Sequence, residues 1–191
     1  MIRYEMQDWV SVLVVGSSGT GKSYTVAQYL RGKRFPFLPS LQSWDLIWVF
    51  DVTGTFREYL PSYFHIWNGE KKRWKYMSIW TPSETIARKF WEELKRFDGK
   101  KLLIVDDMAA MRAEKGNIPF REIAWARNFG VSWIMTTQRV RRIPPEAVHA
   151  AQVLVVFPYR RISDLRELLN TEDIRKVQAL KGKGKYLYFN I

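Results

Sequence analysis

Apolar residues occur in short runs along the chain, and each run ends at polar or glycine residues. We interpret these runs as buried β-strands, because a few consecutive apolar residues between turn-forming residues are typical of strands covered on both faces. The expected strands span residues 8–15, 44–50, 102–105, 131–137, 152–157 and 186–191.

Segments with helical character separate most of these runs. The expected helices cover residues 22–30, 81–98, 119–129 and 163–169, and two more begin at Pro144 and Thr171. Because strands alternate with helices, the sequence predicts an α/β fold with a mostly parallel central sheet flanked by helices. The chain has no repeat, low-complexity stretch or linker, so we expect a single domain over residues 1–191.

The segment between the second strand and the next helix carries two local signals. Residues 63–67 and 76–80 are expected to be short strands around a turn at Asn68-Gly69. The basic stretch between them contains Trp74, and it either contacts nucleic acid or forms a solvated hairpin tip. Thr81 is the expected N-cap of the following helix, with Pro82 in the first helical position.

The first apolar run leads into residues 16–23, GSSGTGKS, which fit the pattern G-x-x-x-x-G-K-[ST] at every fixed position. Glycines let such a loop turn tightly and approach an anion, and the loop N–H groups and the helix N-terminus surround phosphate oxygens. Lys22 can reach the β- and γ-phosphates, and Ser23 can ligate Mg²⁺. The predicted nucleotide-binding residues are Gly16, Ser17, Ser18, Gly19, Thr20, Gly21, Lys22, Ser23 and Tyr24.

Two acidic residues, Asp106 and Asp107, directly follow the apolar run at residues 102–105. In a parallel sheet the carboxyl ends of the strands open on one edge, so Asp106 is expected near Ser23 and Mg²⁺. Asp107 is then placed to hold or polarise the attacking water. These residues supply the second part of the predicted site.

Two further strand ends carry polar residues. Thr136-Thr137-Gln138 ends the run at residues 131–137, where a buried polar side chain can hydrogen-bond the γ-phosphate or the water. Such residues are also common at strand ends without any function. The polar turn at residues 51–56, which includes Gly54, is likewise at a position where open α/β sheets build sites.

Composition narrows the class of protein. The chain has no Cys, and its two His residues, His65 and His149, lack ligand spacing, so a metal-only mechanism is not expected apart from nucleotide-bound Mg²⁺. Neither a signal peptide nor an apolar run long enough to span a membrane is evident. We therefore expect a cytoplasmic protein. Lys and Arg number 31 against 19 Asp and Glu, a net charge of +12, which favours a polyanion such as nucleic acid as partner.

Taken together, these motifs resemble the FtsK–HerA superfamily of DNA-pumping ATPases. The resemblance rests on the phosphate loop, residues 102–107, the turn at residues 51–56, and the sequence ARNFGV at residues 126–131 that leads to TTQR at residues 136–139. It extends through Pro144-Pro145-Glu146 and covers roughly residues 10–160. The resemblance implies a P-loop NTPase fold of the RecA/FtsK type.

The resemblance also implies roles for individual residues. Lys22 and Ser23 would bind ATP and Mg²⁺, Asp106 would support Mg²⁺, and Asp107 would be the catalytic carboxylate. Gln138 would be the sensor, and Arg127 would be an arginine finger offered to a neighbouring subunit. On position alone, Arg127 is equally well explained as a surface residue near a helix C-terminus. The family usually has Glu where this chain has the shorter Asp107.

Small members of this family resemble the genome-packaging ATPases of tailless viruses, and this similarity implies the function. We expect an ATP-driven, sequence-independent DNA translocase that works as a homo-oligomeric ring, a hexamer by analogy, and that engages a viral capsid or vertex protein. Its place would be the host cytoplasm or the virion vertex. The expected DNA-binding residues are the basic loop residues Arg139, Arg141, Arg142, Lys181, Lys183 and Lys185.

Two other functions remain open at this point. A small-molecule kinase of the P-loop type would use the same phosphate loop, with residues 139–142 as an arginine-rich lid. A nucleotide-gated assembly or export factor of a filamentous phage would show little turnover, although such factors usually carry a membrane span.

Overall fold

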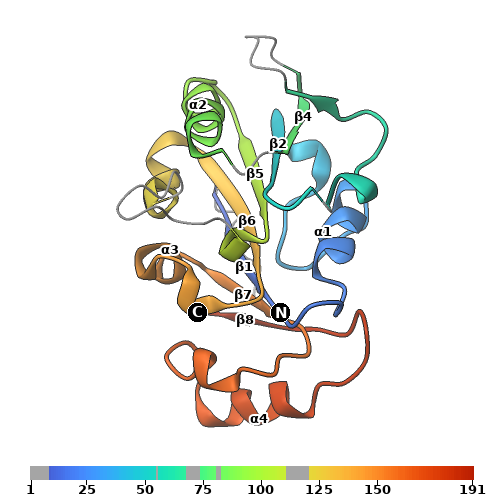
Figure 1. Ribbon diagram of the computed structural model, residues 1–191, viewed down its shortest axis with the longest axis vertical. Coiled ribbons are helices and arrows are strands. Elements are labelled where there is room, and N and C mark those ends of the chain that lie inside the picture. The colour runs from blue at the N-terminus through green and yellow to red at the C-terminus, as the bar shows by residue number, and fades with distance from the viewer. Residues whose placement is uncertain (1–8, 55, 68–73, 81–82, 111–120) are drawn as a thin grey trace.

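An eight-stranded sheet in the order β3-β4-β2-β5-β6-β1-β7-β8 forms the centre of the computed structural model (Figure 1). The structure describes residues 9–54, 56–67, 74–80, 83–110 and 121–191. The strands are β1 (Ser11–Val15), β2 (Leu46–Asp51), β3 (His65–Ile66), β4 (Tyr76–Trp80), β5 (Lys101–Asp106), β6 (Val131–Thr137), β7 (Val153–Val156) and β8 (Leu187–Asn190).

Among the described strands, β1 to β7 all run in one direction, and β8 pairs antiparallel with β7. Every residue of β1, β2, β5, β6 and β7 is buried, as expected for parallel strands that are covered on both faces. The structure therefore confirms the predicted α/β class and the mostly parallel sheet.

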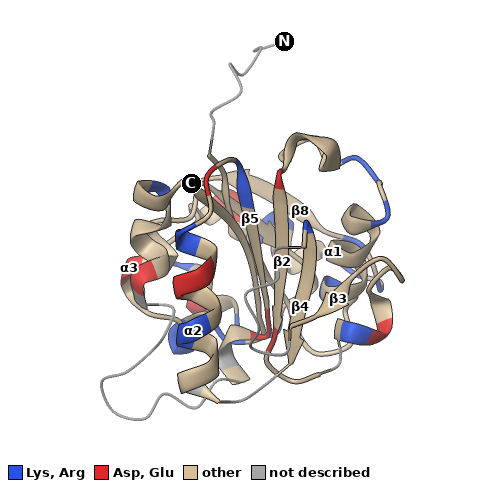
Figure 2. Cartoon of the chain, turned by 90° about the horizontal axis from the view of Figure 1, so that it is seen from above, with Lys and Arg blue, Asp and Glu red and all other residues tan. Residues whose placement is uncertain are grey.

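Helices cover both faces of this sheet. α1 (Lys22–Leu30) lies on one face, whereas α2 (Glu84–Lys95) and α3 (Pro145–His149) lie on the other (Figure 2). α4 (Thr171–Ala179) lies beyond β8, at the bottom of Figure 1. Short 3₁₀ helices complete the described elements: η1 (Leu41–Ser43), η2 (Phe56–Tyr59), η3 (Met108–Ala110), η4 (Arg121–Phe129), η5 (Val140–Arg142) and η6 (Ile162–Leu165).

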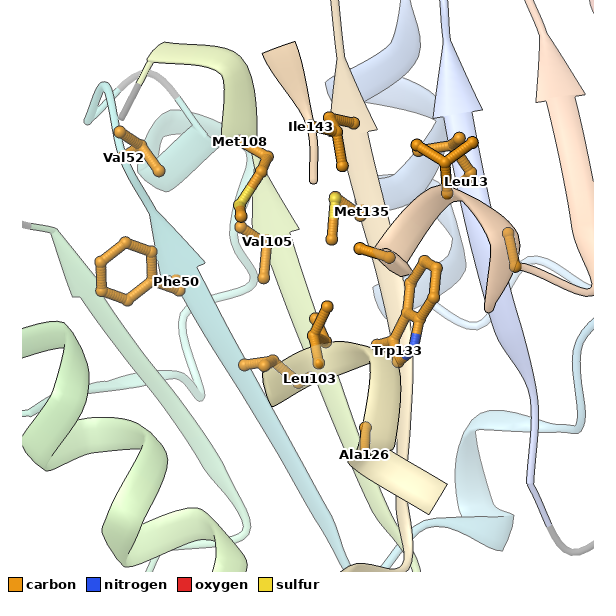
Figure 3. Close-up of a cluster of buried hydrophobic side chains, with 14 of the residues drawn as sticks. Leu13, Phe50, Val52, Leu103, Val105, Met108, Ala126, Trp133, Met135 and Ile143 are labelled. Atoms are coloured by element: carbon orange, nitrogen blue, oxygen red, sulfur yellow. The ribbon is translucent and has the colours of Figure 1, made fainter. Parts of the chain in front are cut away.

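Alternate residues of the central strands β1, β2, β5, β6 and β7 fill two separate cores. Leu13, Phe50, Leu103, Trp133 and Met135 come from four adjacent strands and form the centre of the core beneath α2 and α3 (Figure 3). On the opposite face, strand residues such as Val12, Val49 and Ile104 pack with Val26 and Leu30 of α1. The two cores fix the strands that carry the polar edge described below.

The expected hairpin at residues 63–80 is wrong. β3 pairs with β4 in parallel, with His65 opposite Met77 and Ile66 opposite Ser78, whereas a hairpin would make these strands antiparallel. β4 also pairs in parallel with β2, so all three strands share one direction. The turn at Asn68-Gly69 lies outside the described residues.

Three helices also differ from expectation. α2 is capped by Ser83, whose side chain accepts a hydrogen bond from the Ile86 N–H, while Thr81 and Pro82 lie outside the described residues. The segment predicted as a helix over residues 119–129 is described from residue 121 as the 3₁₀ helix η4, and that predicted over 163–169 is reduced to η6. In η4 the period of three residues points Ile123 and Ala126 into the core.

Candidate functional site

The loop at residues 16–23 joins β1 to α1 and is held against the ends of two neighbouring strands. The Gly16 N–H donates to the Thr137 carbonyl at 3.3 Å, and the Ser17 N–H donates to the Pro158 carbonyl at 3.1 Å. A Cβ atom on Gly16 would lie 2.6 Å from the Phe157 Cβ, so this position requires glycine. Contacts within the protein therefore hold the loop at the carboxyl edge of the sheet.

Lys22 is the first residue of α1, and its side chain curls back over the loop. Its Nζ atom donates to the Ser17 carbonyl at 2.9 Å, and only 7% of Lys22 is exposed. Burial lowers the pKa of the Lys22 ammonium, and the nearby carboxylates of Asp107 and Asp106 act in the opposite direction. A cation is thus held inside the loop, where it can meet an anionic ligand.

Asp106 ends β5 beside Asp51, which ends β2, and the acidic ends of these two strands lie side by side in Figure 2. The Oδ1 atom of Asp106 accepts hydrogen bonds from the Ser23 Oγ and the Thr136 Oγ1, each at 2.8 Å. Burial raises the pKa of Asp106 to about 6, although both hydrogen bonds lower it, and the neighbouring carboxyls of Asp51 and Asp107 add to the rise. A cation bound at this edge would therefore stabilise the ionised form of the buried Asp106 carboxyl.

Asp107 follows directly and has a positive φ of 51°, the one such non-glycine residue that the structure describes. Its N–H donates to the Thr136 Oγ1 at 2.9 Å, and its Oδ2 accepts from the Gln138 Nε2 at 3.1 Å. Burial raises the pKa of Asp107, while Lys22 and the Gln138 amide lower it. Thr136 and Gln138 thus fix the backbone and the side chain of Asp107 from the neighbouring strand.

These residues surround one cavity of about 510 Å³, which is a size typical of small-molecule sites. The described residues that line it are Ser18, Gly19, Gly21, Lys22, Ser23, Tyr24, Thr53, Tyr59, Asp106, Asp107, Thr136, Gln138 and Lys183. The predicted phosphate loop, the acidic strand end and the end of β6 therefore meet in one place.

The donor set also fits Mg²⁺. The Ser23 hydroxyl and the Asp106 carboxylate are hard oxygen donors that lie in direct contact. Within the described ranges, no group of three or more His, Cys, Asp or Glu side chains forms a complete metal site. Mg²⁺ would therefore share its coordination with oxygen atoms of the ligand and with water, as it commonly does with nucleotides.

The predicted arginine finger lies far from its own cavity. Arg127 is exposed near the end of η4, one turn before β6 begins at Val131, whereas Gln138 follows the other end of that strand. Seven residues of strand separate the two edges by about 20 Å. Arg127 therefore belongs to the opposite edge of the sheet.

The predicted DNA-binding residues separate into two groups. Arg141 and Arg142 are exposed on η5, and the Nε atom of Arg141 pairs with the Oδ1 atom of Asp164 at 3.2 Å. Neither they nor Arg139, Lys181 and Lys185 line the cavity. Lys183 differs, because it is one of the lining residues.

Sequence reasoning missed several residues that build the cavity. Thr136 and Thr53 were singled out only as members of the polar strand ends at residues 136–138 and 51–56, and Tyr59 was not singled out. The Asp51 carboxylate holds the turn that contains Thr53 and leads into η2, because it accepts hydrogen bonds from the N–H groups of Gly54 and Arg57. The pairing of Asp51 with Gly54, an acid three residues before a glycine at a strand end, was the available signal.

Almost the whole chain can be superimposed on known ATPase structures. The genome packaging NTPase B204 from Sulfolobus turreted icosahedral virus 2, in complex with AMPPCP, matches with a TM-score of 0.73 at 21% sequence identity. The match covers 97% of this chain and 94% of that chain. The chain has the fold of a P-loop ATPase. The B204 complex with ATP-gammaS gives a TM-score of 0.74 at 19% identity, covering 97% and 93% of the two chains.

A second group of similar structures comes from larger proteins. EssC (ATPases 2 and 3) from Geobacillus thermodenitrificans matches with a TM-score of 0.63 at 14% identity, covering 96% of this chain and 38% of that chain. No family model and no curated protein sequence matches this chain. Within the residues that the structure covers, no helix is long and apolar enough to cross a membrane.

Proposed function

We propose that this chain hydrolyses ATP in the cavity at the carboxyl edge and uses the reaction to move DNA during packaging of a viral genome. The observation that carries the ATPase proposal is one hydrogen-bonded network: Ser23 and Thr136 both donate to Asp106, while Thr136 and Gln138 hold Asp107. The likeness to the genome packaging NTPase B204 over 97% of the chain supports the packaging role.

The phosphate loop and Lys22 bind the triphosphate in this proposal. Loop N–H groups surround the α- and β-phosphates, and the buried Lys22 ammonium exchanges its contact with the Ser17 carbonyl for phosphate oxygens. Ser23 and Asp106 would hold Mg²⁺, an ion that neutralises phosphate charge when it is bound. The burial of Lys22 and Asp106 strengthens the electrostatic contacts that these two residues make.

Asp107 acts on the water that attacks the γ-phosphate. The water oxygen forms a bond to phosphorus, the bond from the γ-phosphorus to the bridging oxygen breaks, and the water proton passes to the Asp107 carboxylate. Burial raises the pKa of Asp107 and so makes its carboxylate a better base. Gln138 donates to the Oδ2 of Asp107, which fixes the orientation of that carboxylate.

DNA and a ring of subunits complete the proposal. The net charge of +12 favours a polyanion, and Arg141 and Arg142 are exposed on η5, which follows the carboxyl end of β6. Arg127 lies too far from its own cavity to act there, so we propose that it reaches the nucleotide of an adjacent subunit in a head-to-tail ring. A capsid or vertex protein would anchor that ring.

The kinase alternative has less support. An arginine-rich lid at residues 139–142 would have to line the phosphate cavity, yet its described lining contains no arginine. The cations in this lining are Lys22 and Lys183.

The test is phosphate release measured with and without long DNA, for the wild-type chain and for Lys22→Ala, beside a measurement of oligomer mass. We expect ATP hydrolysis that DNA stimulates, carried out by an oligomer, and none in Lys22→Ala. Transfer of the γ-phosphate to a small metabolite without stimulation by DNA would support the kinase instead. Absence of hydrolysis with and without DNA would contradict the proposal.

A further inference from the structure

The basic turn at residues 181–185 lies against the phosphate loop, although the two are far apart in the sequence. The Gly184 N–H donates to the Thr20 carbonyl at 2.9 Å. Gly21 faces the same turn: a Cβ atom there would lie 3.3 Å from the Gly184 N and 4.0 Å from the Lys183 Cγ. Gly21 also has a φ of 100°, so both its conformation and its close neighbour require glycine.

Aromatic packing holds this turn in place from its C-terminal side. The ring of Tyr186 lies 5.4 Å from that of Phe157 and 6.2 Å from that of Phe35, measured between centroids. Phe157 is itself the residue that packs against Gly16 of the phosphate loop. The turn is therefore fixed to the loop both through its backbone and through Phe157, which follows β7, so it needs no large movement to face a ligand.

Lys183 is exposed, takes part in none of the ion pairs found among the described residues, and is one of the residues that line the 510 Å³ cavity. Lys181 and Lys185, in the same turn, do not line it. The phosphates of a bound nucleotide would form charge-assisted hydrogen bonds with an exposed ammonium beside the phosphate loop. The position next to Gly21 sets Lys183 apart from the other lysines of the turn.

We propose that Lys183 is a nucleotide ligand that binds the α- and β-phosphates in its own subunit, rather than a DNA contact. This inference rests on the proposed nucleotide-binding function and deepens it. Lys183 approaches the loop at Gly21, whose neighbouring N–H groups surround the α- and β-phosphates. The contacts expected of the γ-phosphate lie instead with Lys22, Asp107 and Gln138. The contribution of Lys183 is therefore the same for ATP and for ADP.

The experiment is equilibrium binding of fluorescent ATPγS and fluorescent ADP, both without DNA, to the wild-type chain and four variants. Lys183→Ala and Lys183→Gln are expected to weaken both nucleotides by about tenfold, the effect of losing one charged hydrogen bond. Lys183→Arg keeps the charge and is expected to bind within about threefold of wild type. Lys89→Ala removes an equal charge from an exposed position on α2 and is expected to leave both affinities unchanged.

The results separate this inference from the function on which it rests. If the wild-type chain binds neither nucleotide, both fall together. If the wild-type chain binds and Lys183→Ala and Lys183→Gln bind equally well, the role of Lys183 is refuted while the nucleotide site stands. A loss confined to ATPγS would contradict the assignment to the α- and β-phosphates. Equal losses for both nucleotides, with Lys183→Arg near wild type, are the result we expect.

Discussion

The Thr136 hydroxyl donates to the Oδ1 atom of Asp106 at 2.8 Å, and both residues are buried. The same hydroxyl oxygen accepts the N–H of Asp107 at 2.9 Å. One side chain on β6 therefore positions both acidic residues that end β5. This makes Thr136 a positioning residue for the proposed reaction.

Thr136→Val should reduce ATP hydrolysis strongly and destabilise the fold by about 1–3 kcal/mol, because it leaves the Asp107 N–H without its partner and leaves the buried Asp106 carboxyl with the Ser23 hydroxyl as its remaining donor. Thr136→Ser keeps the hydroxyl and should restore most of the activity. Thr137→Val is the matched control: the Thr137 hydroxyl bonds the backbone of Arg139 and neither carboxyl. Equal losses of turnover in Thr136→Val and Thr137→Val would contradict the positioning role.

Asp106→Asn should stabilise the nucleotide-free protein at neutral pH. The pKa of Asp106 rises from 3.8 to about 6 on folding, so the folded state favours the protonated carboxyl. The stability that this protonated carboxyl contributes is complete below pH 3.8 and is lost as the pH rises through about 6. The Asn amide oxygen can still accept from Ser23 and Thr136. The variant should therefore gain up to about 3 kcal/mol over wild type between pH 4 and pH 7.

Chemical denaturation of both proteins at several pH values measures this difference. A difference that does not change with pH would mean that Asp106 ionises normally. The same variant should lose the stabilisation that Mg²⁺ adds to bound ATP, because the proposed metal-side carboxylate is gone.

Asp107→Asn should fold and bind ATP normally but hydrolyse it about two to four orders of magnitude more slowly. Asn tolerates a φ of 51° at least as well as Asp, so the backbone should not change. Single-turnover hydrolysis beside nucleotide binding provides the measurement. Turnover near the wild-type rate would remove Asp107 from the role of base.

Arg127→Ala should be inactive alone and should regain partial ATPase activity when mixed with Lys22→Ala. Arg127 is about 20 Å of strand away from Gln138 in its own subunit, so it can serve only a neighbour. In mixed oligomers some interfaces pair an intact phosphate loop with an intact Arg127. Full activity of Arg127→Ala alone, or no recovery in verified mixed oligomers, would leave it a surface residue.

DNA affinity should fall steeply between about 50 and 200 mM salt and should depend little on sequence. Arg142→Ala should reduce the slope of log affinity against log salt by about one, because it removes one exposed phosphate contact. Arg141→Ala should have a smaller effect, since Arg141 already pairs with Asp164. Lys183→Ala should leave the slope unchanged if that lysine binds nucleotide. A salt-independent affinity would indicate another partner.

The predictable residues of the site are those that follow neighbouring strands of a parallel sheet, because such strand ends meet at one edge. Residues 16–23 carry a complete phosphate-loop pattern, and Asp106 and Gln138 follow apolar runs, so their arrival at one edge follows from topology. The role of Thr136 was not predictable, because whether a buried hydroxyl faces a carboxyl depends on the register between β5 and β6.

Two features were not predictable, because the sequence carries only a weak local signal for the first and the second depends on a contact between distant segments. β3 has two residues, too few for a pattern to reveal its direction, and the Asn68-Gly69 signal favoured a hairpin. Lys183 lies in a turn whose composition is equally typical of a DNA contact. The approach of Gly184 to Thr20 and the place of Lys183 in the cavity lining are the contacts that favour nucleotide as its ligand, and the sequence does not reveal them.

That contact between Gly184 and Thr20 also has a consequence for synthesis of the chain on the ribosome. The phosphate loop leaves the exit tunnel early, whereas residues 181–185 leave it only after every strand from β1 to β7 has been made. Until then the emerging loop lacks its covering turn and Tyr186. A nascent chain should therefore reach its full affinity for nucleotide only after this turn has been made, in a late step that adds the roughly tenfold contribution of Lys183.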